Sequence, residues 1–177
     1  MNAVAAALGL RLGMPLADAR AMHPGLAVDH ADPAADQRLA EAVCDWLGRY
    51  TPLVGLSNAG MMLDISGCAH LFGGEDAMRK DIVRKLGLQG FTARTAIAGT
   101  VGAAWALARF ADKRIVDDGE LRETILPLPL AALRLDADKL DTLARVGLKK
   151  IADIVDRPRA PLAARFGAAL LRRLDEA

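Results

Sequence analysis

The sequence has few aromatic residues: Phe, Trp and Tyr make up 4% of its 177 residues, whereas hydrophobic residues make up 53%. Its core must therefore be built mainly from Ala, Leu, Val and Ile. A chain of this length is sufficient for one large domain or two small ones with a sizeable core.

Cysteine is scarce as well, because the chain has Cys44 and Cys68 alone. Two cysteines do not make a disulfide-rich secreted fold, so we expect reduced thiols, although the two could pair. Cys68 and His70 could suggest half of a zinc site, but zinc takes about four ligands and no second pair follows. The sequence therefore predicts no metal site and no cofactor.

Long hydrophobic runs are missing, and nothing approaches the roughly 20 apolar residues of a membrane-spanning helix. The apolar stretch 3–10 has no basic segment before it and predicts a helix instead of a signal peptide. We therefore expect a soluble, cytoplasmic protein. The net charge is only +1, but residues 145–177 carry eight Lys or Arg against four acids. This basic end is a candidate phosphate-binding surface.

The first 50 residues predict three helices, at 2–12, 14–22 and 34–49, with a short strand at 26–28. Pro15 falls in the first turn of the second helix, where its missing N–H costs nothing. Trp46 lies in the apolar stripe of the third helix, so we interpret it as a core residue and not as a base-stacking platform.

The stretch from Tyr50 to Glu75 predicts a β-hairpin and a turn into a helix. Two apolar runs flank Ser57-Asn58-Ala59-Gly60, which has the composition of a hairpin turn. The second run, 61–65, suits a strand buried in the middle of a sheet. Gly73-Gly74 is interpreted as a turn, not a phosphate site, because Glu75 would repel an anion at the start of the helix 75–86. Met78, Ile82 and Leu86 are expected to face the core, and Arg79, Lys80, Arg84 and Lys85 the solvent.

Further along, we expect a strand at 92–98, a helix at 101–111 buried against the sheet, and a short strand and turn at 115–120. The proline-punctuated run 125–130 predicts a stiff connector and a domain boundary.

The last third of the chain has the pattern of a helix-hairpin-helix. One apolar stripe stops at Gly147 and a new one begins at Leu148, so Val146-Gly147-Leu148 is the predicted turn. Lys149 and Lys150 would open the second helix, with backbone amides and ammonium groups directed at a phosphate. These five residues are the predicted DNA-binding site, with a plain helical turn as the alternative. Such a contact has no sequence preference and weakens with salt. A closing helix is expected at 162–174.

Several stretches of the sequence resemble the Y-family (translesion) DNA polymerases, and within them the ImuB group of polymerase-like proteins. Tyr50-Thr51-Pro52-Leu53-Val54 and the run 57–67 match the palm of that family. Further similarity lies at 13–21, 67–75 and 96–109. The resemblance implies an α+β fold with an incomplete palm, made of a mixed or antiparallel sheet and packed helices. It places fingers elements at 1–30, the palm at 31–124 and a small all-α helix-hairpin-helix thumb at 125–177.

The main departure from the family is at its catalytic Asp-Glu pair, which falls on Ala59 and Gly60. Polymerase chemistry uses two magnesium ions held by anionic oxygens, and these two residues offer none. Asp64 remains, but it matches a strand aspartate outside the metal-binding pair. We therefore expect no catalytic residues and no metal ligands. Lys113 and Arg114 correspond only loosely to a family lysine that meets the triphosphate.

The resemblance implies a non-catalytic DNA-binding scaffold in damage-induced (SOS) translesion synthesis and mutagenesis. The partners it implies are primer-template DNA, an error-prone replicative-type polymerase, a RecA-like accessory protein and the sliding clamp, without a membrane. Two alternatives stay open: an active error-prone polymerase that uses Asp64 and an aspartate outside this sequence, or a protein-interaction module that does not bind DNA. The first palm strand and the little finger of the family have no counterpart here, so we expect a fragment with an exposed sheet edge.

Overall fold

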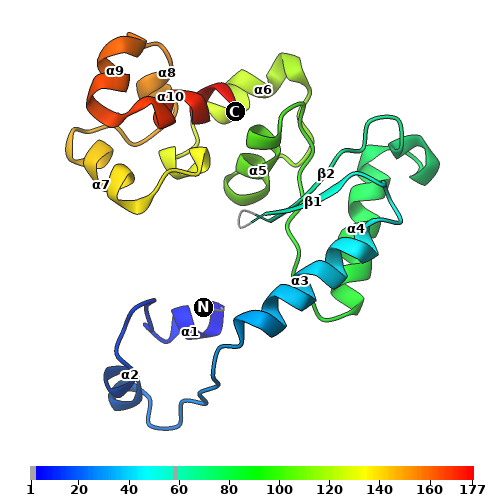
Figure 1. The fold of residues 1–177 in the computed structure, drawn as a ribbon, viewed down its shortest axis with the longest axis vertical. Helices are drawn as coiled ribbons and strands as arrows, with labels where there is room; N and C mark the ends of the chain where they lie inside the picture. The colour runs from blue at the N-terminus through cyan, green and yellow to red at the C-terminus, as the bar shows by residue number, and fades with distance from the viewer. Residues whose placement is uncertain (1–2, 58–59) are drawn as a thin grey trace. The chain divides into compact units, whose positions relative to one another are not determined.

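The computed structural model describes residues 3–57 and 60–177. The chain divides into two compact units, Met1–Leu39 and Ala40–Ala177, and each is described by itself. Figure 1 traces the order of the elements, which are helices apart from one pair of strands in the described residues. The domain limits predicted from the sequence, at residues 30 and 124, stay predictions.

The first unit is built from short helices. The first of them, α1 (Ala3–Ala7), ends earlier than predicted, because Gly9 adopts a φ of +78° that reverses the chain. The next, α2 (Leu16–Met22), starts directly after Pro15, and the Nε2 atom of His23 lies 2.8 Å from the carbonyl oxygen of Leu8. The predicted strand at 26–28 is wrong, since those residues have no regular structure and no described strand of this unit could pair with them.

The helix α3 (Pro33–Leu47) begins where the sequence predicts it. Oδ1 of Asp32 accepts a hydrogen bond from the Ala35 N–H at 2.9 Å and so caps the first turn. At its other end, Trp46 packs edge-to-face on Tyr50, with ring centroids 5.8 Å apart. The interpretation of Trp46 as a packing residue is confirmed.

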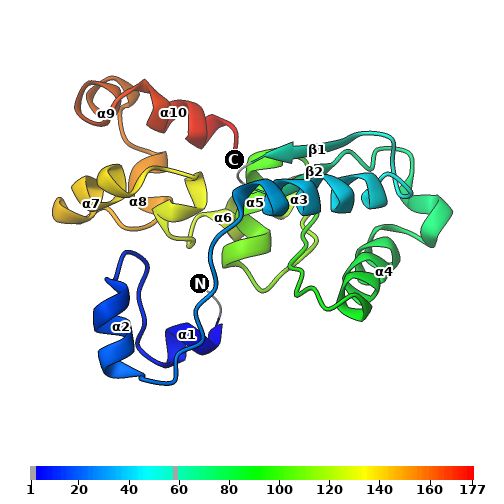
Figure 2. The same ribbon diagram turned by 60° about the horizontal axis from the view of Figure 1, so that its bottom comes forward.

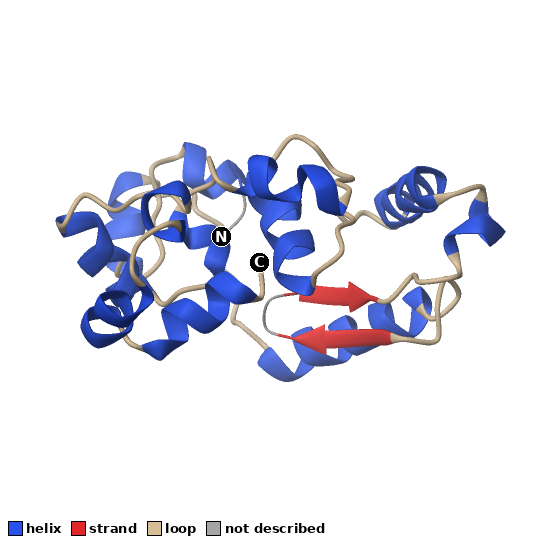
Figure 3. Ribbon diagram, turned by 90° about the horizontal axis from the view of Figure 1, so that it is seen from above, coloured by secondary structure: helices blue, strands red, loops and turns tan. Residues whose placement is uncertain are grey.

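The predicted β-hairpin is confirmed in β1 (Val54–Ser57) and β2 (Gly60–Leu63). The strands pair antiparallel, with Val54 opposite Leu63 and Ser57 opposite Gly60, as the opposed arrows in Figure 3 show. The prediction of a strand buried in the middle of a sheet is wrong. Among the described residues the sheet has these two strands, so β2 is paired along one edge and is only half-buried.

The predicted turn and helix after the hairpin are confirmed. A 3₁₀ turn, η1 (Ala69–Phe72), leads to Gly73 and Gly74, both with positive φ, and then to α4 (Glu75–Leu88). One expectation for α4 is wrong: the side chain of Arg79 is only 18% exposed and pairs with Asp76 at 2.8 Å. The core under the hairpin consists of Leu47, Tyr50, Met78, Ile82 and Leu86.

The region after α4 differs from the expected strand–helix–strand order. Residues 92–98 are not a strand; only Ile97 forms an isolated parallel bridge, to Ile115. The helix α5 (Val101–Phe110) is confirmed, capped by Thr100, whose Oγ1 accepts from the Ala103 N–H at 3.1 Å. The predicted strand and turn at 115–120 give way to α6 (Asp118–Ile125), because acidic residues at 117, 118 and 120 favour a helix start.

The C-terminal part is a small all-α bundle, which Figure 2 shows in yellow to red. The run 125–130 is not a free connector, because Leu128 and Leu130 are buried in its core. Gly167, with a φ of +87°, breaks the predicted helix 162–174 into two. The elements are η2 (Leu130–Leu133), α7 (Ala137–Arg145), α8 (Ala152–Val155), α9 (Arg159–Phe166) and α10 (Ala168–Asp175). Its fully buried side chains include Leu133, Leu143, Ile151, Ile154 and Leu170.

Candidate nucleic-acid interface

The bend of the β-hairpin is the position at which the resemblance places the catalytic pair. Ala59 lies outside the described residues, while Gly60 opens β2 opposite Ser57. The φ of Gly60 is +125°, a conformation that L side chains rarely adopt. A glutamate at this position would therefore need a different backbone conformation.

Asp64, the remaining carboxylate of the hairpin, has a local structural role. Its Oδ1 accepts a hydrogen bond from the Ser66 N–H at 2.9 Å, and this bond holds the pKa of the carboxyl below its ordinary value. Its backbone oxygen accepts from Oγ1 of Thr51 at 2.6 Å. Asp64 thus fixes the exit of β2 and is exposed to solvent.

The residues of this site do not fit a pair of magnesium ions. Mg²⁺ requires several hard oxygen ligands in near-octahedral geometry. The hairpin offers one carboxylate, already engaged with a backbone amide. Within residues 3–57 and 60–177, no group of three or more His, Cys, Asp or Glu side chains is placed to hold a metal ion.

Beneath the hairpin, Tyr50 joins the core to α4. Its hydroxyl donates to Oδ2 of Asp81 at 2.7 Å, and Asp81 also pairs with Arg84 and Lys85, both at 2.6 Å. These donors, Lys85 first, lower the pKa of Asp81 far below its ordinary value.

Replacing Asp81 with Asn is expected to remove an acid-sensitive part of the stability. Because the folded pKa lies below the unfolded value of about 3.9, the ionised carboxylate stabilises the fold above about pH 4. That contribution is lost as the pH falls below this value. Urea unfolding of the wild type and Asp81→Asn should differ at pH 7, and the difference should narrow steadily as the pH falls below about 4. Asp141→Asn is the control, and an equal difference at pH 7 and below about pH 4 would contradict the assignment.

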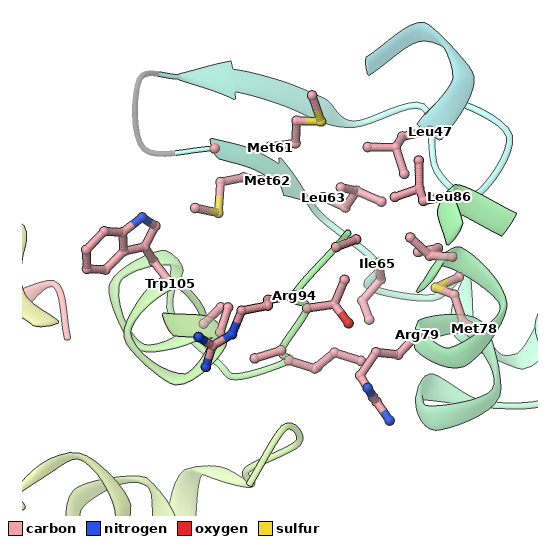
Figure 4. Close-up of a pocket in the computed structure, with 18 of the residues that line it drawn as sticks. Leu47, Met61, Met62, Leu63, Ile65, Met78, Arg79, Leu86, Arg94 and Trp105 are labelled. Atoms are coloured by element: carbon pink, nitrogen blue, oxygen red, sulfur yellow. The ribbon is translucent and has the colours of Figure 1, made fainter. Parts of the chain in front are cut away.

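A cavity of about 480 Å³ lies between β2, α4, α5 and residues 92–98. Figure 4 shows its apolar side, where Leu63 lies near Leu47 and Leu86 and Ile65 lies toward Met78. Its described lining includes Arg79, Arg94 and Arg109 but no acidic residue. Sequence reasoning did not find this cavity, because its walls come from segments far apart in the chain.

A turn lies between α7 and α8 at the predicted position, but the second helix differs from the one predicted. Gly147 has a φ of +80°, as a turn between two helices requires. Leu148 is buried, and Val146, Gly147, Lys149 and Lys150 are exposed. Lys149 and Lys150 do not open a helix, since α8 begins only at Ala152.

The backbone amides of this turn are already bonded within the protein. Those of Val146, Gly147 and Leu148 donate to carbonyl oxygens of α7. Those of Lys149 and Lys150 both donate to Oδ2 of Asp153, each at 2.8 Å, and these bonds lower the pKa of Asp153. The expectation of free amides directed at a phosphate is therefore wrong: a carboxylate takes that place.

The cations of the basic end differ in how they are compensated. Arg159 pairs with Asp175, while Arg172 and Arg173 pair with Glu176. Lys149 and Lys150 have no ion pair among the residues that the structure describes, and Arg145 has none in that part of the chain either. Three cations without an ion pair thus lie within six residues around the turn, beside the carboxylate of Asp153. Arg157 and Arg165 also form none among the described residues, but Arg157 donates to the backbone oxygen of Asp153 and Arg165 lies over the ring of Phe166.

Asp153 was missed, although a carboxylate three and four residues after two candidate amides is a capping signal. Lys113 pairs with Glu120, and Arg114 donates to the carbonyl oxygens of Leu107 and Ala108 at 3.0 Å. Arg114 thus caps the end of α5, and Lys113 is held on α6.

Comparison with known proteins decides the family. The sequence profile described as IMS, the impB/mucB/samB family, matches residues 1–109. The chain belongs to the impB/mucB/samB family. The Protein ImuB of Caulobacter vibrioides (strain NA1000 / CB15N) is 48% identical over 172 residues, which cover 96% of this chain and 38% of that protein. The chain thus spans well under half of the curated relative's length.

Solved structures place this family member in the Y-family polymerase fold. A DinB family error-prone DNA polymerase from Sulfolobus solfataricus matches with a TM-score of 0.80 and 17% identity, over 98% of this chain and 55% of that one. An insertion ternary complex of Dbh DNA polymerase matches with a TM-score of 0.79 and 17% identity, over 98% and 54%. The predicted α+β, polymerase-like fold is confirmed over the part of the solved structures that this chain covers. No helix in the described ranges is both long and apolar enough to cross a membrane.

Proposed function

We propose that this chain is a non-catalytic, polymerase-like DNA-binding scaffold for translesion synthesis and damage-induced mutagenesis. Family membership, the ImuB relative and the likeness to an error-prone DNA polymerase support a role in this process. The observation that carries the non-catalytic part is the hairpin bend, where Ala59-Gly60 replaces two carboxylates.

The backbone at the bend supports the same conclusion. A carboxylate regained at position 60 would be strained by the φ of +125°. Asp64 is exposed and accepts a hydrogen bond from the Ser66 N–H. One carboxylate therefore remains where a polymerase needs several to hold its metal ions. The fold would then serve to hold DNA and partner proteins, and the chemistry would belong to another enzyme.

DNA contact is assigned to the turn between α7 and α8. Because Asp153 occupies the amides of Lys149 and Lys150, the contact would be made by their ammonium groups. Phosphate contacts of this kind hold any sequence and release counterions, so the affinity must fall with salt. As partners we propose an error-prone replicative-type polymerase, a RecA-like protein and the sliding clamp, in the cytoplasm, as the resemblance to the ImuB group implies.

The test combines primer extension with a band shift on the same primer-template DNA. We expect a shifted band whose intensity falls steeply between low and physiological salt, and no extension with Mg²⁺ or Mn²⁺. Extension that Asp64→Asn abolishes would show an active polymerase and overturn the proposal. Absence of a shifted band at low salt would favour a protein-interaction module.

Replacing Asp153 with Asn is expected to tighten DNA binding about threefold to tenfold. The change removes a negative charge beside Lys149 and Lys150 and weakens its hold on their amides. Fluorescence anisotropy with labelled duplex measures the effect, and a melting curve confirms the fold. Asp156→Asn is the control, because Asp156 pairs with Arg122 and contacts no amide of the turn. Equal affinity of Asp153→Asn and wild type would contradict the assigned surface.

A further inference from the structure

Arg134 has an unusual backbone conformation. Among the described residues it is the only one besides glycine with a positive φ, which is +57°. It directly follows η2, and its N–H donates to the carbonyl oxygen of Ala131 at 3.1 Å. Glycine is favoured where a chain leaves a helix in this conformation, because a Cβ is crowded there. An arginine at this position is therefore strained, and a strained residue persists where its surroundings hold it.

The side chain of Arg134 is held by Glu176, which comes directly after α10. The guanidinium is 17% exposed and donates from Nη2 to Oε2 of Glu176 at 2.8 Å. Arg173 donates to the same oxygen at 2.7 Å. An ion pair that is partly shielded from water and belongs to a network stabilises more than an isolated exposed pair. This pair thus joins the end of η2 to the end of α10.

Glu176 is also fixed by α5. An added Cβ at Gly102, near the start of α5, would collide with the carbonyl oxygen of Glu176, so the two backbones are in close contact. The helix η2 packs in the same hydrophobic core as Ala106 of α5. The ion pair of Arg134 and Glu176 therefore closes a ring of contacts that runs from η2 to α10, to α5 and back to η2.

The position of η2 determines where the lysines of the turn between α7 and α8 lie. Residues 128–130 lead into η2 and form an antiparallel bridge with Lys150. The N–H of Leu130 donates to the carbonyl oxygen of Lys149 at 2.9 Å, and the N–H of Ile151 donates back to the same segment at 3.0 Å. A shift of η2 would therefore be passed directly to the backbone of both lysines.

We propose that Arg134 is a positioning residue for DNA binding: its ion pair with Glu176 fixes η2 and thereby the place of Lys149 and Lys150. The inference rests on the proposed DNA contact of these two lysines. In this role the guanidinium of Arg134 is directed at Glu176 and contacts no phosphate. A phosphate-binding role predicts the opposite result, because Arg134 would then gain from the removal of the competing carboxylate.

Glu176→Gln is the decisive variant, because its charge and its effect on position act in opposite directions. It removes one negative charge, which by itself would tighten binding to DNA. We expect instead that the affinity for labelled duplex falls about threefold to tenfold at about 0.1 M salt, measured by fluorescence anisotropy. Asp175→Asn is the matched control. This neighbouring carboxylate pairs with Arg159 on α9, so the same charge change should leave the affinity unchanged or raise it.

Arg134→Gln should lower the affinity as Glu176→Gln does, and the double variant should lower it no further, because both changes remove the same ion pair. Arg134→Lys, which keeps a cation beside Glu176, should recover part of the loss. The slope of log affinity against log salt should stay within about 0.5 of the wild-type value, since Arg134 contacts no phosphate. Binding is measured where circular dichroism shows every variant to be folded, so that a loss of stability alone would not change the affinity.

Amide exchange tests the same contacts without DNA. In Glu176→Gln and Arg134→Gln, the amides of Leu130 and Ile151 should exchange about tenfold faster, because they form the bridge that the ion pair holds in place. The amide of Ile82 in α4 is the internal reference and should not change. Unchanged exchange at the bridge would overturn the inference.

The affinity of Glu176→Gln separates this inference from the proposed function. If the wild type binds DNA and Glu176→Gln binds it equally well or more tightly, the inference fails and the DNA-binding function stands. If the wild type itself does not bind DNA at low salt, the proposed function fails and the positioning role fails with it.

Discussion

Charge reversal at both Lys149 and Lys150 is expected to weaken binding to primer-template DNA about a hundredfold at about 0.1 M salt. The two ammonium groups are exposed and have no ion pair in the described part of the chain, so their charge is available to phosphates. Losing about two phosphate contacts should reduce the slope of log affinity against log salt by about 2. Anisotropy titrations at four or five salt concentrations measure both quantities.

The matched control for this experiment is Arg20→Glu/Arg38→Glu. It changes the net charge by the same amount, at exposed positions on α2 and α3 that form no ion pair within the described ranges. We expect the control to lower the affinity less than threefold with an unchanged slope. A control as damaging as the test variant would mean that DNA responds to net charge alone, and the assignment to the α7–α8 turn would fail.

Replacing Gly102 with Ala is expected to destabilise the protein by about 2–3 kcal/mol. In most helices this change gains about 1 kcal/mol of helix propensity. At Gly102, however, an added Cβ would lie 2.2 Å from the carbonyl oxygen of Glu176 and 2.7 Å from its carbonyl carbon. These are backbone atoms of a residue whose side chain pairs with Arg134 and Arg173, so they yield only if the packing of α10 changes.

Gly87→Ala is expected to have the opposite effect and to stabilise the same protein. Gly87 lies inside α4, and an added Cβ there would meet nothing within 4 Å. Urea denaturation should show it to be more stable than the wild type by about 0.5–1 kcal/mol. If Gly102→Ala behaved like Gly87→Ala, the close contact between α5 and residue 176 would be absent in solution.

Elements specified by nearby residues were predictable from the sequence. The hairpin follows from a turn composition between two apolar runs, and α4 from a Gly-Gly turn before a stripe at 78, 82 and 86. The absence of carboxylates at 59 and 60, on which the proposed lack of catalysis rests, could also be read there.

Features that depend on distant partners were not predictable. A strand pattern at 92–98 becomes a strand only when a neighbour supplies its hydrogen bonds, and among the described residues it has one bridge to Ile115. The cap at Lys149 and Lys150 was missed because a sequence reading favours their ammonium groups and overlooks a carboxylate bonding to their amides. The position of the turn was predicted correctly, whereas the carboxylate that accepts hydrogen bonds from its amides was not predicted.

Helix α5 lies between the C-terminal core and the cavity beneath the hairpin. Ala106 is part of the C-terminal core, while Trp105 and Ala108, on either side of it in sequence, line the cavity beside β2. Loss of α5 would therefore disrupt the C-terminal core and open the wall of the cavity together, and we expect it to couple the two regions in unfolding. The polymerase-like body from residue 40 onward should melt in a single cooperative step, and a ligand that tightens either end would raise the melting temperature of both.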